Sequence, residues 1–354
     1  MSRNIWVKKI DFLRRIDYNG EVKSKKGSIA MKIKEIVAVA AAMGIFVFVG
    51  CNYHRLFPQE ETTVPTTATE APSTVPPTTE EPTTLKQYDF SQLRYSANSA
   101  AAACYDCAEQ RFLYEKNASA RIAPASLTKI VTVCVALQYA DPSVVYTVGD
   151  EVNLVQKDSS LCFIRPGHQV TLYDLLCGML LVSGNDAAYT VAVNVARAVS
   201  GPSLTAQEGV ACFVGLMNDF AQEHGMTDSH FVNPEGWDDP QQYMSARDIA
   251  IAADYAMGLA PFREIIAKTA YHAAFVSGQT IDWTNSNQMI DPASPFFTPG
   301  VVGGKTGTTQ TAGKCLLAVF QDDAHSLIAV SMGNPTEEER FYSVRELFDT
   351  VLAQ

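Results

Sequence analysis

The sequence predicts an α+β fold in which an antiparallel sheet is covered by helices. Two short apolar segments, residues 101–104 and 111–114, flank a polar turn and have the pattern of a hairpin. A second strand-like pair, residues 316–320 and 327–332, lies near the end of the chain. Segments with helical spacing of apolar residues separate the two pairs. Strands at both ends with helices between them are typical of a sheet that packs against helices.

Five helices are expected between and after these strands. The first follows Pro124 and begins at Ser126, a residue type that favours helix entry. In the fourth, Ala246, Ile249 and Ala253 fall on one face, which indicates burial of that face. The expected ranges are 126–139, 172–182, 186–199, 245–257 and 337–352.

The charge is distributed unevenly along the 354 residues. Residues 1–34 hold 10 Lys and Arg against 3 Asp and Glu, whereas the rest hold 17 against 35. An acidic body argues against nucleic-acid binding, which needs a basic face. The hydrophobic content of 47% excludes wholesale disorder and a polytopic membrane protein. Eight cysteines are too few for a disulfide scaffold.

The N-terminal part is expected to direct export and attachment to a membrane. A basic head, residues 1–35, precedes an apolar run at residues 36–51, and this charge order predicts a cytoplasmic head with the body outside. The run is either an uncleaved signal-anchor or a lipoprotein signal that ends at Cys51. If the run is a lipoprotein signal, Met31 would be the translation start, and residues 31–34 would be its compact basic segment.

Residues 52–87 form a Thr/Pro-rich stretch with little to bury, and we expect a disordered stalk there. Six prolines between residues 58 and 84 favour an extended chain, whose reach is on the order of 80 Å. Residues 88–354 then form one globular domain. Because the chain stops soon after the last expected helix, we expect the N-terminal segment to be its membrane attachment.

Three short motifs carry the candidate chemistry, and the first is Ser126-Leu127-Thr128-Lys129. Residues three apart lie on one face of a helix, so the hydroxyl and the ammonium become neighbours. In a buried cleft the pKa of the lysine falls, and a neutral lysine can act as general base toward the serine. Serine and lysine at this spacing are common, so the motif is weak by itself.

The second motif, Ser183-Gly184-Asn185, lies at a turn between two expected helices and offers a hydroxyl and an amide. The third, Lys305-Thr306-Gly307, precedes a strand-like run, and its lysine and hydroxyl suit a ligand that carries a carboxylate. The motifs are 57 and 122 residues apart. Their order is the signature of penicillin-binding proteins and serine β-lactamases.

The chain resembles the D-alanyl-D-alanine carboxypeptidases, the low-molecular-mass penicillin-binding proteins, over most of residues 101–351. The similarity rests on these segments: Pro124-Ala125-Ser126-Leu127-Thr128-Lys129, Ser183-Gly184-Asn185-Asp186-Ala187-Ala188, His230-Phe231-Val232-Asn233-Pro234, Ser245-Ala246-Arg247-Asp248, Asn285-Ser286-Asn287 and Gly304-Lys305-Thr306-Gly307. The resemblance implies a β-lactamase/transpeptidase-like fold, in which an antiparallel sheet is flanked by helices and a helical subdomain. The family often has histidine in the segment written here Asn233-Pro234-Glu235-Gly236-Trp237, whereas this chain has Glu235 and Trp237 there.

The resemblance also implies the role of each site residue. Ser126 would form an acyl-enzyme with the D-Ala-D-Ala carbonyl after activation by Lys129. Ser183 would pass a proton to the leaving D-alanine, and Asn185 would hold the substrate amide. The remaining residues would contact the substrate: Lys305, Thr306 and Gly307 near its carboxylate, Arg247 as a second carboxylate ligand, and the N–H groups of Ser126 and Thr308 at the oxyanion.

The resemblance implies a penicillin-sensitive serine carboxypeptidase that trims peptidoglycan stem peptides and takes part in maintaining cell shape. Its partners would be the stem peptide, β-lactam inhibitors and the membrane, and no cofactor is needed. Three alternatives remain open: a DD-endopeptidase, a β-lactamase, and a non-catalytic penicillin sensor or wall-binding protein. A zinc site is not expected because no histidine pair has ligand spacing. Cys104 and Cys107 have redox spacing but lack the matching context, so we expect packing roles.

Overall fold

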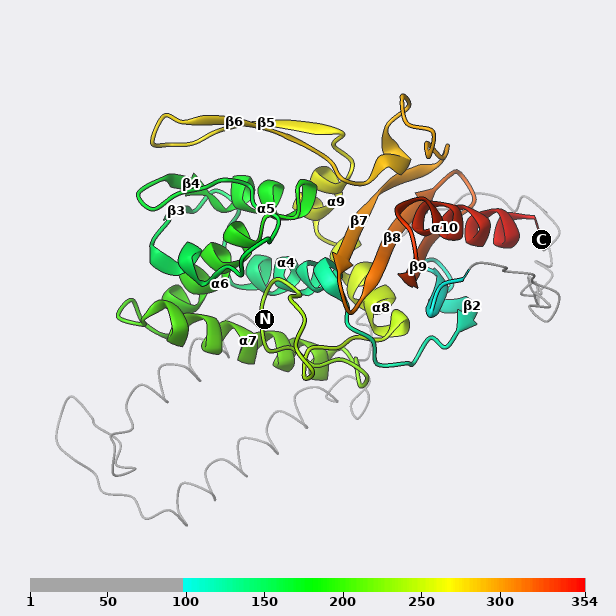
Figure 1. Ribbon diagram of the computed structural model, residues 1–354, viewed down its shortest axis with the longest axis horizontal. Helices are drawn as coiled ribbons and strands as arrows, with labels where there is room; N and C mark the ends of the chain where they lie inside the picture. Colours follow the sequence, from blue (N-terminus) through cyan, green and yellow to red (C-terminus); the bar gives the residue numbers. More distant parts are fainter. Residues whose placement is uncertain (1–97, 354) are drawn as a thin grey trace, which may run out of the picture. The chain divides into compact units, whose positions relative to one another are not determined.

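A five-stranded antiparallel sheet forms the centre of the computed structural model, which describes residues 98–353 (Figure 1). The order β2-β1-β9-β8-β7 places the first hairpin beside the last three strands, so the two ends of the described chain share one sheet. The predicted α+β class is confirmed. The strands are β1 (Ala101–Asp106), β2 (Arg111–Lys116), β7 (Val301–Thr309), β8 (Gly313–Gln321) and β9 (Ser326–Asn334).

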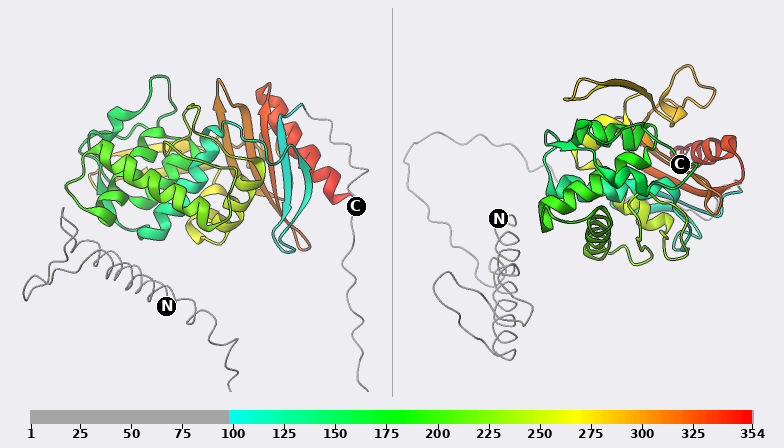
Figure 2. Two further views of the ribbon diagram at one scale, coloured as in Figure 1. Left: turned by 90° about the horizontal axis from the view of Figure 1, so that it is seen from below. Right: turned by 60° about the vertical axis from the view of Figure 1, so that its left-hand side comes forward.

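The sheet buries both faces, and the side chains of its central strands alternate between two hydrophobic clusters. On β8, Leu317 and Val319 face the helical subdomain, whereas Leu316 and Phe320 face the opposite side. Helix α10 (Glu337–Leu352) covers that opposite side and leaves the sheet between two layers of helix (Figure 2). Burial on both faces explains why the strand-like segments near the C-terminus are almost entirely apolar.

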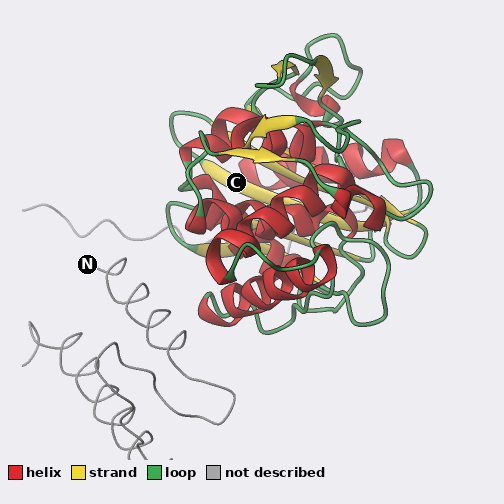
Figure 3. Ribbon diagram, turned by 90° about the vertical axis from the view of Figure 1, so that its left-hand side faces the viewer, coloured by secondary structure: helices red, strands yellow, loops and turns green. Residues whose placement is uncertain are grey.

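Helix α4 (Thr128–Tyr139) is the core of the helical subdomain, since its first nine residues are all buried. It packs against α6, α7 and α8, and the helices screen the sheet from one side (Figure 3). The helices of this layer are α5 (Leu172–Leu181), α6 (Asn185–Ser200), α7 (Ala206–Glu223), α8 (Ala246–Met257) and α9 (Ala260–Ile266).

Hydroxyl side chains cap the starts of four helices. Thr171, Thr205, Ser245 and Thr336 each accept a hydrogen bond from the backbone N–H three residues later. The glutamates three residues after Thr205 and Thr336 return a hydrogen bond to the cap, which completes a capping box. Three of these caps lie at predicted helices, α5, α8 and α10, whose observed starts agree with the prediction to within one residue.

Three features differ from the sequence predictions. Lys305-Thr306-Gly307 lies inside edge strand β7 rather than before a strand. Helix α7 was not predicted, although its buried residues Phe213, Met217 and Phe220 follow helical spacing. The short elements were also missed: helix α9 (Ala260–Ile266), η2 (Ala125–Leu127), η3 (Asp150–Leu154), η4 (Gln288–Ile290), the hairpin of β3 (Val145–Thr147) with β4 (Gln169–Thr171), and that of β5 (Ala270–Ala274) with β6 (Thr280–Thr284).

The predicted basic head, apolar run and stalk lie outside the described residues, so their boundaries stay predictions. Within residues 98–353, no helix combines the length and the apolar character needed to cross a bilayer.

Candidate functional site

Ser126 lies in a tight turn that leads into α4. Ala125 has a positive φ of 49°, and η2 then turns the chain so that Ser126 remains only partly buried. Gly236 fits this turn closely: a Cβ atom there would lie 1.8 Å from the carbonyl oxygen of Ala125. Since Gly236 also has a φ of 93°, only glycine allows this approach. The hydroxyl is therefore held at the start of the helix by its surroundings.

Lys129 lies one helical turn after Ser126 and has no exposed surface. Its Nζ atom donates to three oxygens, each at 2.8 Å: Oγ of Ser126, Oδ1 of Asn185 and the backbone carbonyl of Glu235. The three oxygens come from η2, from α6 and from the segment before α8. Lys129 thus joins the first two sequence motifs directly.

Burial lowers the pKa of Lys129 to about 8, against the opposing influence of the Glu235 and Asp186 carboxylates. Removing an ammonium group from water disfavours its charged form, which is the dominant effect here. A substantial fraction of Lys129 is therefore neutral near physiological pH, as a general base requires.

The hydrogen-bond partners decide where a neutral Lys129 points its lone pair. The Asn185 carbonyl oxygen and the Glu235 backbone oxygen can only accept hydrogen bonds, so they occupy the two N–H groups of the amine. The Ser126 hydroxyl is the one partner of the three that can donate. The lone pair consequently faces the Ser126 proton, and this geometry activates the oxygen as a nucleophile.

Ser183 lies beside this group in a strained conformation, with a φ of 62°. Its side chain is buried, and its Oγ atom has no hydrogen-bond partner among residues 98–353. A buried hydroxyl without a partner is unfavourable unless a ligand completes it. Ser183 is therefore available to a substrate, whereas Asn185 already uses its Oδ1 atom on Lys129.

Asp186 fixes the loop that passes over the second motif. Its carboxylate accepts hydrogen bonds from the backbone N–H groups of Cys162, Ile164 and Ala187, at 2.9, 3.1 and 3.0 Å. The N–H of Asn185 in turn donates to the Ser160 carbonyl at 2.8 Å. Because these bonds hold the loop and the start of α6 together, Asp186 positions Asn185 for Lys129.

Strand β7 brings the third motif to the same place. A Cβ atom at Gly307 would lie 3.2 Å from the Ser126 nitrogen and 3.1 Å from Cβ of Ala125, so this part of the strand touches the turn. Thr306 shares a hydrogen bond of 2.7 Å with Ser286. Glycine at position 307 therefore allows the edge strand to approach the nucleophile.

Lys305 is buried in β7 and donates to the carbonyl oxygen of Thr306 at 3.0 Å. Burial lowers the pKa of Lys305 strongly, and the positive charges of Lys129 and Arg340 act in the same direction. The basic side chains of Lys129, Lys305 and Arg340 thus lie near enough around β7 for their charges to interact. Such a site favours a ligand that brings a negative charge.

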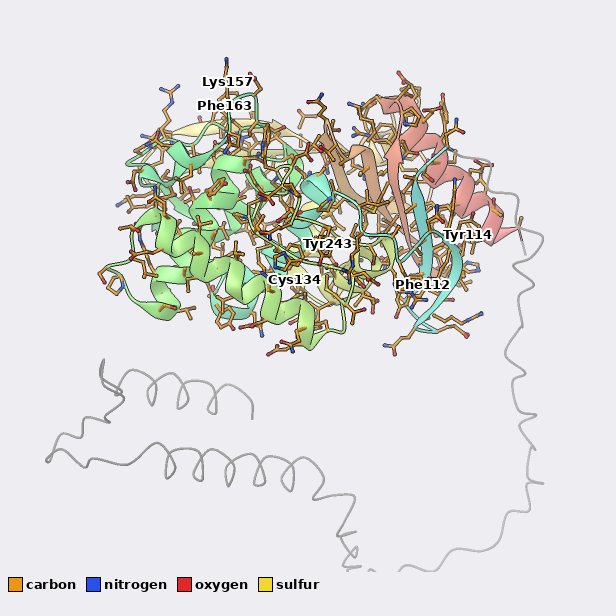
Figure 4. The ribbon with its side chains drawn as sticks, turned by 60° about the horizontal axis from the view of Figure 1, so that its bottom comes forward. Phe112, Tyr114, Cys134, Lys157, Phe163 and Tyr243 are labelled. Carbon is orange, nitrogen blue, oxygen red and sulfur yellow. The ribbon has the colours of Figure 1, made fainter. Side chains whose placement is uncertain are left out.

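Arg247 is not brought to this group, contrary to the role expected from the sequence. Its guanidinium lies 2.8 Å from the Glu115 carboxylate and stacks on the ring of Phe112 at 4.1 Å. Both partners belong to β2, which is the opposite edge of the sheet from β7 (Figure 4). The sheet order, which the sequence alone did not establish, separates Arg247 from the third motif.

Arg340 supplies the cation that the sequence analysis missed. It lies on α10, is almost fully buried, and donates to Oγ1 of Thr308 at 3.1 Å. Glu337 pairs with it from the preceding turn of the helix. An arginine in an otherwise apolar helical stripe was the available signal, but its position beside β7 depends on how α10 packs.

The described residues contain no group of three or more His, Cys, Asp or Glu side chains arranged to hold a metal ion. Their seven cysteines are all free, Cys104 and Cys107 included. The arrangement is thus a serine with a lysine base, an unpaired second serine, an amide, and a cationic edge strand.

Comparison with known proteins places this arrangement in a family. The family model for D-alanyl-D-alanine carboxypeptidase (Peptidase_S11) matches residues 86–336. The chain belongs to this family.

Curated bacterial relatives agree with this assignment. The chain is 32% identical over 271 residues to the D-alanyl-D-alanine carboxypeptidase DacF of Bacillus subtilis, covering 75% of this chain and 64% of the relative. It is 32% identical over 262 residues to DacC of Escherichia coli, covering 71% and 60%. The chain therefore spans about three fifths of the length of these relatives.

The fold matches that of the Streptomyces K15 DD-transpeptidase, with a TM-score of 0.67 and 26% sequence identity. The match covers 73% of this chain and 98% of the transpeptidase. A putative penicillin-binding protein homologue from Mycobacterium tuberculosis matches with a TM-score of 0.63 and 25% identity, covering 73% and 92%. The predicted transpeptidase-like fold is confirmed.

Replacing Asp186 tests how the loop and the site depend on one buried carboxylate. Asp186→Ala leaves three backbone donors without an acceptor, and we expect the free energy of unfolding to fall by about 2–4 kcal/mol. Denaturant titration measures it. Asp323→Ala, at an exposed aspartate, is the control and is expected to change stability by less than about 0.5 kcal/mol. Equal stability of the two variants would show that Asp186 does not hold the loop.

Proposed function

We propose that this protein is a serine-type D-Ala-D-Ala carboxypeptidase that removes the terminal D-alanine from peptidoglycan stem peptides. The observation that carries the proposal is the 2.8 Å contact between Lys129 and Ser126, in which the two other Lys129 partners are obligate acceptors. Family membership supports the substrate class, because the relatives are D-alanyl-D-alanine carboxypeptidases.

In the first half-reaction, the Ser126 oxygen attacks the carbonyl between the two D-alanines and its proton passes to Lys129. The N–H groups of Ser126 and Thr308 stabilise the oxyanion, an interaction worth several kcal/mol in comparable sites. The C–N bond then breaks as Ser183 passes its proton to the leaving amine and regains one from the Lys129 ammonium, which leaves Lys129 neutral again. Water hydrolyses the Ser126 ester in the second half-reaction, which releases the shortened peptide and restores the serine.

Substrate binding uses the free edge of β7. As the last strand in the sheet order, β7 can pair an extended peptide along its outer side. The carboxylate of the terminal D-alanine then meets Lys305, Thr306 and the charge of Arg340, while the Asn185 amide group contacts the peptide backbone. In this proposal Arg340 takes the part that the sequence suggested for Arg247.

The same geometry makes β-lactam antibiotics inhibitors, because their strained amide carbonyl can acylate Ser126 in place of the peptide. Their carboxylate occupies the position of the D-alanine carboxylate on β7. A slowly hydrolysed ester then blocks the nucleophile.

Release of D-alanine from a pentapeptide that ends in D-Ala-D-Ala tests the proposal. We expect the full chain to release D-alanine and Ser126→Ala to lose at least about 10³-fold in rate, since the nucleophile is absent. Ser203→Ala, at an exposed serine, serves as the matched control and is expected to retain the wild-type rate. D-alanine release by Ser126→Ala at the wild-type rate would refute the assignment.

The pH dependence of acylation tests the state of Lys129. Only the neutral amine accepts the Ser126 proton, so the rate rises as pH increases through the lysine pKa of about 8. We expect a tenfold rise per pH unit below that value and a plateau above it. Stopped-flow measurement with a chromogenic penicillin between pH 6 and 9.5 gives the profile. A rate independent of pH over this range contradicts a lysine base.

We also propose that residues 36–51 attach the protein to the bacterial membrane and that residues 52–87 hold residues 88–354 away from it. The charge order and the Thr/Pro-rich composition support this topology. Intact-mass measurement on protein extracted from membranes distinguishes the two forms of attachment. A lipidated chain that begins at Cys51 is expected for a lipoprotein, and an unlipidated chain that retains residues before Cys51 for a signal-anchor. A soluble chain that begins after Cys51 would contradict membrane attachment.

A further inference from the structure

Glu235 is a buried acid beside the general base, and the proposed reaction does not use its side chain. The residue is 1% exposed, and its carboxylate lies near the side chains of Tyr189 and Asn185 without a well-formed hydrogen bond to either. Its own backbone carbonyl accepts the hydrogen bond from Lys129 at 2.8 Å. Burying an ionised carboxylate with few hydrogen bonds is unfavourable unless a nearby positive charge offsets its loss of hydration.

The backbone around Glu235 is fixed against α4. The Pro234 carbonyl accepts a hydrogen bond from Thr132 at 2.6 Å, and Asn233 closes the turn by accepting from the Gly236 N–H at 2.7 Å. Gly236 contacts the turn before Ser126 so closely that no side chain fits there. The backbone of Glu235 is consequently held beside Lys129.

Five titratable groups share this region. Burial raises the pKa of Glu235, while the Lys129 charge and the Tyr189 and Asn185 side chains lower it. The carboxylates of Glu235 and Asp186 raise the pKa of Lys129, and the charge of Lys129 lowers the pKa of Lys305 on β7. One residue, Glu235, thus supplies both the backbone carbonyl that orients Lys129 and a buried acidic side chain.

We propose that Glu235 is a positioning residue that sets the pH range in which Lys129 activates Ser126. The inference rests on the proposed serine chemistry. An ionised Glu235 favours the ammonium form of Lys129, so it keeps the base protonated to a higher pH than burial alone would.

The sign of the effect follows from charge alone. Glu235→Gln keeps the shape and the backbone carbonyl but removes the anion, so the ammonium of Lys129 loses an attractive partner. The pKa of Lys129 then falls further, and the acid limb of the acylation profile moves to lower pH by about one unit. Glu235→Asp keeps the charge and is expected to lie closer to the wild-type midpoint.

Acylation by a chromogenic penicillin, measured from pH 5 to 9.5 with each curve normalised to its own plateau, tests this effect. Tyr189→Phe removes a hydroxyl that stabilises the Glu235 carboxylate and is expected to shift the midpoint in the same direction by a smaller amount. Tyr255→Phe is the matched control, since Tyr255 packs against Phe220 and His224, and we expect no shift. A role limited to packing would change the plateau without moving the midpoint.

A second readout does not depend on catalysis. The ¹³Cε resonance of Lys129, assigned by its absence in Lys129→Met, reports the lysine titration directly, and Glu235→Gln is expected to lower its midpoint by about one unit. Midpoints within about 0.2 unit of wild type in Glu235→Gln overturn the inference, and if that variant does not fold, an unshifted Glu235→Ala does so. A wild-type protein that penicillin does not acylate would contradict the proposed function instead, and the lysine titration would still decide the role of Glu235.

Discussion

The side chain of Lys129 is the constraint on which the arrangement of the site depends. An ammonium group without exposed surface is unfavourable unless each of its N–H groups meets an oxygen. The three oxygens come from different parts of the chain: Ser126, Asn185 on α6, and Glu235 in the segment before α8. Folding of the helical subdomain therefore buries Lys129 and orients its amine at the same time. Burial lowers the pKa of Lys129 to about 8.

Two glycines, Gly236 and Gly307, allow the close backbone packing that completes the site. Gly236 lets its segment contact the turn before Ser126, and Gly307 lets the edge strand approach the same turn. Larger residues would separate the nucleophile from the strand that carries Lys305. The cationic strand and the lysine base thus meet where the sheet ends and the helical subdomain begins, so the nucleophile lies beside a strand edge able to pair with a peptide.

Local patterns predicted much of this architecture, and long-range packing explains what they missed. The apolar runs predicted strands β1, β2, β8 and β9 and the starts of α4, α5, α6, α8 and α10 to within two residues. The spacing of Ser126 and Lys129 predicted that they lie together. The partners of Arg247 and Arg340 depend on sheet order and on the docking of α10, which no local pattern specifies. Glu235 was noticed only as a departure from the family, because its position against Lys129 depends on the fold of the intervening residues.

The central claim is that Lys129 directs its lone pair at Ser126 and makes that hydroxyl the nucleophile. Peptide mapping by mass spectrometry after brief exposure of the folded protein to penicillin tests it directly. The account predicts a single penicilloyl adduct, on the peptide that contains Ser126, and no adduct on the peptide that contains Ser183. An adduct on Ser183, or adducts spread over many peptides, would contradict it.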